Sequence, residues 1–229
     1  MSLKVNSLLS ASLLSIGMLA VSGSAGAATT VIWGDPVPAT PEVTCAGVGY
    51  EWTVQMGKGQ KASFVRHVGA KSWNEPPPAY EPPYTGWTHT SDWVAFELKK
   101  DSHVTIQIAR QQGVLMSSIA TDPVSGSPSV KYTPAGNGLY PAFSVYSGWE
   151  ETGCEDHRYN TGGATPWAPS LVFADNQPNT QGWSTATWNG PLKAGKYSIA
   201  IGGANVSFCA PTDSCYTGRH GYRATITTK

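Results

Sequence analysis

Charge and long apolar stretches are scarce in this chain, and each scarcity excludes a class of function. Only 13% of the residues are charged, and 15 basic side chains balance 15 acidic ones, so the formal net charge is zero. Without a basic surface there is no electrostatic footprint for nucleic acid or for an anionic membrane. Beyond residue 21, no segment is apolar enough to predict a membrane span.

The N-terminus has the features of a secretory signal peptide. Lys4 supplies a positive charge, residues 8–21 form a short apolar run, and residues 25–27 (Ala-Gly-Ala) match a cleavage site. We therefore expect residues 1–27 to be removed. Residues 28–229 should then form one exported domain, which is secreted or held on the outer cell surface, since this length is ample for a single core.

Motifs for catalysis are also missing. The chain contains neither a Gly-x-Ser-x-Gly elbow nor a His-Glu-x-x-His pair. A copper-dependent polysaccharide oxygenase chelates its metal with an N-terminal histidine, and the predicted mature start at Ala28 has none. We expect a protein that is not an enzyme.

Cysteines are few, and their number suits an exported protein. Four cysteines in an oxidising compartment predict two disulfides. Cys209 and Cys215 flank a turn-like segment, which favours a local pair and leaves Cys45 to bond with Cys154. A metal site made of thiolates is the less favoured alternative.

Short alternating segments between turns rich in the 25 glycines and 17 prolines predict the fold. Residues 92–98, 103–110, 196–202 and 221–228 carry apolar side chains at every second position, as strands with one buried face do. The polar residues 99–102 predict a hairpin that makes the first two segments antiparallel neighbours. Residues 133–189 are predicted to form long loops. The fold class is therefore all-β, an antiparallel β-sandwich with long Gly/Pro/Trp-rich loops.

The segment 86–93, with the sequence GWTHTSDW, carries the main candidate site. Trp87 and His89 stand two positions apart at the start of a predicted strand, so their side chains point to the same face. Histidine is the commonest metal ligand, and neutral imidazole suits copper and zinc. A second histidine, His157, lies in a polar loop at residues 155–160. If the fold brings these residues together, they form a nitrogen-rich metal site.

Two pairs of stretches, 67–75 with 86–94 and 139–150 with 156–160, resemble the copper-binding surface proteins of methane-oxidising bacteria, the MopE/CorA type. The resemblance implies that His89 and His157 ligate copper, and that Trp87 is oxidised to kynurenine and serves as the third donor. An intact indole nitrogen only donates a hydrogen bond, whereas ring opening produces an aromatic amine that can coordinate.

The resemblance further implies copper scavenging when copper is scarce, with copper(I) preferred to copper(II) because it is soft and accepts two or three nitrogen ligands. A partner at the outer-membrane surface is conceivable for such a protein. We expect a monomer that does not bind nucleic acid.

The remaining histidines receive structural interpretations. His103 should face solvent, and His220 should lie in a turn. His67 is the substitute ligand should His157 fail. Calcium is a weaker alternative to copper, because residues 155–156 and 175–177 offer hard oxygen donors without the spacing of an EF-hand.

Nine tryptophans in a weakly charged exported chain also raise a second hypothesis, a carbohydrate-binding β-sandwich. Exposed aromatic rings stack on sugar faces, so this hypothesis predicts an exposed platform built from Trp149, Trp167, Trp183 and Trp188.

Overall fold

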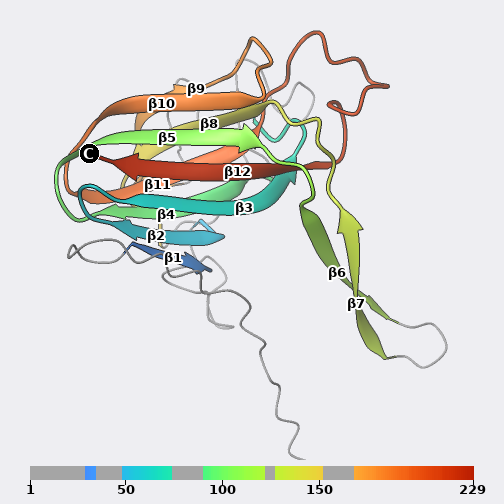
Figure 1. Cartoon of the computed structure of the whole chain (residues 1–229), viewed down its shortest axis with the longest axis horizontal. Helices are drawn as coiled ribbons and strands as arrows, with labels where there is room; N and C mark the ends of the chain where they lie inside the picture. Colours follow the sequence, from blue (N-terminus) through green and yellow to red (C-terminus); the bar gives the residue numbers. More distant parts are fainter. Residues whose placement is uncertain (1–28, 35–47, 74–89, 122–126, 152–167) are drawn as a thin grey trace, which may run out of the picture.

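The computed structural model describes residues 29–34, 48–73, 90–121, 127–151 and 168–229, and all regular structure in these segments is β-strand (Figure 1). Among them, no helix of the length and apolarity needed to cross a membrane occurs. The predicted all-β sandwich is confirmed, as two larger sheets pack together.

The first sheet has six strands in the spatial order β1-β2-β4-β11-β8-β9. Their bounds are β1 Thr30–Trp33, β2 Trp52–Met56, β4 Asp92–Leu98, β8 Pro141–Ser147, β9 Val172–Gln177 and β11 Gly195–Gly203. The second sheet has the order β10-β5-β12-β3, with β3 Lys61–Gly69, β5 Ser102–Arg110, β10 Thr185–Leu192 and β12 Arg219–Thr228. All pairings in these two sheets are antiparallel except that of β2 with β4, which is parallel.

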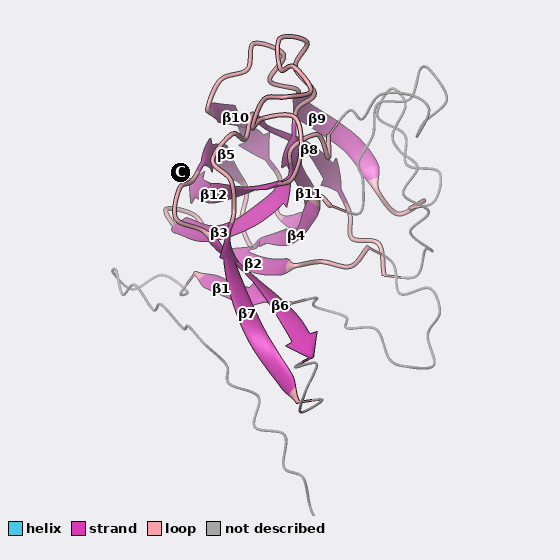
Figure 2. Ribbon diagram, turned by 90° about the vertical axis from the view of Figure 1, so that its right-hand side faces the viewer, coloured by secondary structure: helices cyan, strands magenta, loops and turns pink. Residues whose placement is uncertain are grey.

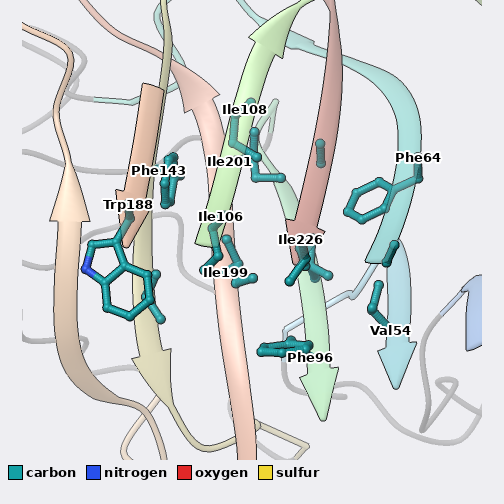
Figure 3. Close-up of a cluster of buried hydrophobic side chains, with 14 of the residues drawn as sticks. Val54, Phe64, Phe96, Ile106, Ile108, Phe143, Trp188, Ile199, Ile201 and Ile226 are labelled. Carbon is teal, nitrogen blue, oxygen red and sulfur yellow. The ribbon is translucent and has the colours of Figure 1, made fainter. Parts of the chain in front are cut away.

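The main core lies between these two sheets, and it is built by the alternation seen in the sequence. Val94, Phe96 and Leu98 of β4 face inward and belong to the same buried cluster as the apolar side chains of β5. β11 and β12 contribute theirs in the same way, and Figure 3 shows the inward-pointing side chains of several strands in one layer. Burial of such side chains provides the main driving force for the fold.

The predicted hairpin between β4 and β5 is wrong. β4 pairs with β2 and β11 in the first sheet, whereas β5 pairs with β10 and β12 in the second. The short polar connection at residues 99–101 therefore passes from one sheet to the other. Alternation shows which face of a strand is buried, and both strands do bury the predicted face, but it does not show which sheet the strand joins.

The predicted long loop at residues 133–189 is also wrong over much of its length. This range contains β8, β9 and most of β10. β8 was missed because its residues from Pro141 to Tyr146 are buried on both faces, so the strand shows no alternation. β10 was missed because Asn189, Gly190 and Pro191 are typical of turns.

A second buried cluster covers the outer face of the six-stranded sheet. It joins Trp93 and Ala95 of β4 and Tyr146 of β8 to residues that precede or follow strands. The members from outside the strands are Val48, Tyr50, Trp73, Ala168, Leu171, Ala204, Val206 and Cys209. We call this set the outer cluster.

A third, two-stranded sheet extends away from the sandwich. It consists of β6, Leu115–Thr121, and β7, Pro128–Pro134, which pair in an antiparallel arrangement. Figure 2 shows this ribbon projecting from the body of the molecule, as does Figure 1.

Candidate metal centre

The residues that carry the metal-site prediction, Trp87, His89 and His157, lie outside the described residues, as do Cys45 and Cys154. The structure does describe the residues that flank their segments. Trp73 and Thr90 bound the segment that carries Trp87 and His89, and Glu151 and Ala168 bound the segment that carries His157.

The two ends of the segment 74–89 are joined by hydrogen bonds. The Ser91 hydroxyl donates to the Ser72 carbonyl oxygen at 3.1 Å, and both side chains are buried. The Gly69 N–H donates to the Thr90 carbonyl oxygen at 2.9 Å. Trp73 is itself held by its N–H, which donates to the Gly203 carbonyl oxygen at 2.9 Å. The chain therefore leaves and re-enters the sandwich at one place.

Hydrogen bonds of Glu150 join the residues on either side of the segment 152–167 in the same way. This side chain is 2% exposed, and its Oε2 accepts hydrogen bonds from the Ser170 hydroxyl at 2.6 Å and from the Ser170 N–H at 3.2 Å. The Ser170 hydroxyl also donates to the Trp149 carbonyl oxygen at 2.8 Å. We call these hydrogen bonds between Glu150, Ser170 and Trp149 the Glu150 clamp. The Glu150 N–H also donates to the Tyr50 hydroxyl at 3.0 Å, which connects the clamp to the outer cluster.

Both segments start from the same face of the molecule. Trp73, which precedes residue 74, and Ala168, which follows residue 167, are both members of the outer cluster. Trp73 also directs its indole N–H at the Ser144 hydroxyl of β8, at 3.4 Å. One described end of each segment that carries a predicted histidine ligand thus lies in the same buried cluster.

His220 is a structural histidine, and it lies in β12 instead of the predicted turn. It is 3% exposed and uses both ring nitrogens: Nδ1 accepts a hydrogen bond from the Gly138 N–H at 2.9 Å, and Nε2 donates to the Thr217 carbonyl oxygen at 3.0 Å. A side chain at Gly136 would collide with this ring, since an added Cβ would lie 2.3 Å from Nδ1. With both nitrogens engaged, His220 has no lone pair free for a metal.

His67, the substitute ligand, has surroundings that repel cations. Its Nδ1 lies 3.1 Å from Nη1 of Arg219. Burial, reinforced by the positive charges of Arg219 and Arg66, lowers the pKa of His67 to about 4. The ring is therefore neutral at physiological pH, but two guanidinium groups face it. His103, as predicted, is exposed, and its Nε2 lies 2.6 Å from Oδ1 of Asn189.

A partly buried ionic cluster lies directly after the segment with His89. Arg66 Nη1 lies 3.2 Å from Oδ1 of Asp92 and 3.6 Å from Oε1 of Glu51, while the Tyr222 hydroxyl donates to the other oxygen of Asp92 at 2.7 Å. Burial raises the pKa of Glu51 to about 8, with a smaller contribution from the charge of Asp92. Burial also raises the pKa of Asp92 to about 6, although Arg66 opposes the shift.

Sequence reasoning missed this cluster. Its members come from β3, β4, β12 and the residue before β2, and no spacing along the chain connects them. The N–H of Trp93 donates to Oε2 of Glu51 at 2.6 Å, so the cluster also holds the first residues of β4 in place.

Among the described residues, the one group of three potential metal ligands is Cys209, Asp213 and Cys215. The two sulfurs form the predicted local disulfide, with a Cα–Cα distance of 6.1 Å, so they are not thiolates. Asp213 accepts a hydrogen bond from the Ala210 N–H at 2.9 Å and shapes the turn. The disulfide and the hydrogen bond of Asp213 therefore stabilise this turn.

The predicted tryptophan platform does not form from the described residues. Trp188 is buried in the main core and donates its indole N–H to Asp175 at 2.7 Å. Trp149 is partly buried and donates to the Tyr197 carbonyl oxygen at 2.9 Å. Trp183 is 68% exposed, while Trp167 lies outside the described residues. The prediction is wrong for Trp149 and Trp188.

A protein-family model matches part of the chain. Residues 50–121 match the model of the family described as copper(I)-binding protein CorA-like, and this range includes Trp87 and His89. The match confirms the resemblance noted in the sequence. No curated protein matches the chain.

The chain also shows a limited likeness to three solved structures, each with a TM-score under 0.5. The surface-associated copper-binding protein CorA of Methylomicrobium album BG8 is 16% identical, with a TM-score of 0.45, over 77% of this chain and 100% of that one. Mercury-soaked MopE, a secreted protein of Methylococcus capsulatus in which an oxidised tryptophan facilitates copper binding, is 15% identical, with a TM-score of 0.40, over 88% and 94% of the two chains. The pre-peptidase C-terminal domain of a Bacillus anthracis collagenase is 7% identical, with a TM-score of 0.33, over 76% and 94%.

Proposed function

We propose that this chain, which matches the CorA-like copper(I)-binding family over residues 50–121, binds a copper ion through His89, His157 and an oxidised Trp87. The protein acts outside the cytoplasm, after removal of residues 1–27, and captures copper when copper is scarce. It is a binding protein and not an enzyme. The family match over the Trp87-Thr88-His89 segment is the observation that carries this proposal.

The described residues support the proposal in two ways. Trp73 and Ala168, which each flank one of the two segments, both belong to the outer cluster, and this is consistent with a site shared by His89 and His157. The other histidines are poor competitors, because His220 uses both nitrogens and His67 faces two arginines. A bond between Cys45 and Cys154 would further restrict the segment that carries His157.

Copper(I) is the preferred form, because soft copper accepts two imidazoles with a third weak donor, and such a site excludes hard cations such as calcium. Copper(II) favours more ligands in a tetragonal arrangement. Kynurenine at position 87 would supply the aromatic amine as the third donor.

The test is a titration of the purified protein with copper(I) against a chromogenic chelator, using a reductant that leaves disulfides intact. We expect the wild type to compete for one equivalent of copper, and the His89→Ala and His157→Ala variants to lose this competition. His103→Ala is the matched control, because it removes an exposed histidine in β5 and should leave binding unchanged. Tight binding retained in His89→Ala would contradict the assignment.

The role of Trp87 has a separate test. Mass spectrometry of the peptide that contains residue 87 should detect kynurenine in the protein isolated from its native source. Trp87→Phe should keep the two imidazoles and bind copper more weakly. An unmodified Trp87 in protein that binds copper tightly would remove kynurenine from the site but leave the histidine ligands.

A further inference from the structure

Three lysine side chains from separate parts of the chain line one hollow at an end of the sandwich. Lys58 lies in the turn between β2 and β3, Lys193 lies in the turn between β10 and β11, and Lys229 follows β12. These parts of the chain lie beside the point marked C in Figure 1. The hollow has a volume of about 470 Å³. This volume is within the usual range for sites that bind small molecules.

The positive charge in this hollow is only partly neutralised. Asp101, in the connection between β4 and β5, is the one acidic side chain of the lining. Its Oδ2 lies 2.9 Å from Lys193 Nζ, and its Oδ1 accepts a hydrogen bond from the Ala194 N–H at 2.8 Å. Among the residues that the structure describes, neither Lys58 nor Lys229 has a carboxylate partner. Two ammonium groups at this hollow are therefore unpaired.

The backbone that carries these two lysines is held in place by hydrogen bonds. The Thr228 hydroxyl donates to the Gly57 carbonyl oxygen at 2.6 Å, so the turn with Lys58 is joined to the end of β12. Lys229 exchanges two backbone hydrogen bonds with His103 of β5, at 2.9 and 3.1 Å. The fold itself therefore brings Lys58 and Lys229 to one place.

The lining selects an organic anion. Like charges repel one another, so ammonium groups that lie together are stabilised by an oxyanion between them. Lysine binds carboxylate and phosphate groups as a point charge with three donors. Pro191 and Leu192 supply an apolar wall to the same hollow, and Leu192 packs against the main core. A carboxylate, or a sulfate or phosphate monoester, that carries a small apolar body suits both parts of the lining.

We propose that this hollow binds a small organic oxyanion, whose charged group contacts Lys58 and Lys229 and whose apolar body packs against Pro191 and Leu192. The site is separate from the proposed copper site. The hollow lies beyond the end of β4 at Leu98, whereas the segment with His89 precedes the start of this strand. The two ends of β4 are about 20 Å apart, from a rise of about 3.4 Å per residue.

Isothermal titration calorimetry of the purified protein in a chloride buffer tests the proposal, with inorganic phosphate and phenyl phosphate as probes. Phenyl phosphate should bind once per chain and at least about fivefold more tightly than inorganic phosphate, because its ring is buried against the apolar wall. Lys58→Gln and Lys229→Gln should each weaken the binding of phenyl phosphate at least about fivefold. The matched control is Lys131→Gln, which removes an exposed lysine of β7 outside the hollow and should leave binding unchanged.

Three results would overturn the proposal. The first is a wild type that binds no phenyl phosphate up to about 10 mM. The second is an equal loss of affinity in Lys58→Gln and Lys131→Gln, which would show unspecific attraction by surface charge. The third is binding to phosphatidylglycerol vesicles without binding to phenyl phosphate, which would assign these lysines to a membrane surface. Lys58→Gln should bind copper(I) as the wild type does, so this test is independent of the copper site.

Discussion

Glu51, Arg66 and Asp92 place two carboxyl groups around one guanidinium group at the start of β4. Arg66 can neutralise one carboxylate, and the second carboxyl group is then stable in the interior only when it is protonated. Burial is the main cause that raises the pKa of Glu51 from 4.5 to about 8 and that of Asp92 from 3.8 to about 6, and the charge of Asp92 adds to the shift of Glu51. The cluster therefore links the stability of the fold to pH.

The direction of this linkage follows from the two pKa values of Glu51. Between pH 4.5 and pH 8 the folded chain keeps a proton that the unfolded chain releases, so the free energy of unfolding falls as pH rises through this window. We predict that Glu51→Gln, which is neutral at every pH, removes much of the fall, by up to about 4 kcal/mol between pH 5 and pH 8. Urea denaturation at several pH values measures this difference.

Glu151→Gln is the control for this prediction, because Glu151 lies on the surface, where its Oε1 is 3.2 Å from Lys196 Nζ. Its substitution should leave the pH dependence unchanged. A Glu51→Gln protein that loses as much stability as the wild type between pH 5 and pH 8 would show that Glu51 is already ionised at pH 5.

At the scale of elements, Ser170 makes the central hydrogen bonds of the Glu150 clamp, which joins the residues on either side of the segment 152–167. Its hydroxyl donates to Glu150 and Trp149, and without it the buried Glu150 carboxyl group loses a short hydrogen bond. We predict that Ser170→Ala destabilises the fold by about 1–3 kcal/mol and weakens copper binding several-fold, because the segment that carries His157 is less well oriented. Thermal unfolding and the copper(I) titration measure the two effects.

Ser63→Ala provides the matched comparison for the clamp. The Ser63 hydroxyl also donates to a backbone carbonyl oxygen, that of Ala224 at 3.1 Å, but it lies in β3, in the sheet opposite the outer cluster. It should lower stability without changing copper affinity. If Ser170→Ala leaves copper affinity at the wild-type value, the clamp does not orient the ligand.

The strands also show how much of the fold could be predicted from the sequence. Alternation correctly predicted the strands β4, β5, β11 and β12 and their inward faces, because one buried face produces a period of two. It failed for the pairing of β4 with β5, since strands that face each other across a sandwich and strands that lie side by side carry the same pattern. It also failed for β8, which is buried on both faces.

The candidate site stays a prediction from the sequence. The spacing of Trp87 and His89 and the family resemblance both pointed to copper, and the family match includes this segment. The clamps of Ser91 and Glu150 could not be predicted, because each joins residues that are brought together only by the fold. The same holds for His220, whose two partners are backbone groups at residues 138 and 217.

At the scale of the whole molecule, the proposed copper site and the fold should stabilise each other. The segments that carry the proposed ligands join the sandwich at the outer cluster, so unfolding would abolish a site shared by His89 and His157. A ligand that binds only the folded chain raises its stability by an amount set by the ratio of free ligand to Kd. Copper should therefore protect the whole sandwich against heat, and not only the segments proposed to bind it.

We predict that copper(I), buffered at about 1,000 times its Kd, increases the free energy of unfolding by about 4 kcal/mol. For a chain of this size the increase corresponds to a rise in Tm of about 8–16 °C, which a copper(I) chelator should reverse. Differential scanning calorimetry measures the change, with ascorbate as the reductant so that the Cys209–Cys215 bond stays intact. His103→Ala should show the full rise, and His89→Ala should show none. If His89→Ala were protected as strongly as the wild type, copper would bind elsewhere on the folded chain, and the candidate site would lose its main support.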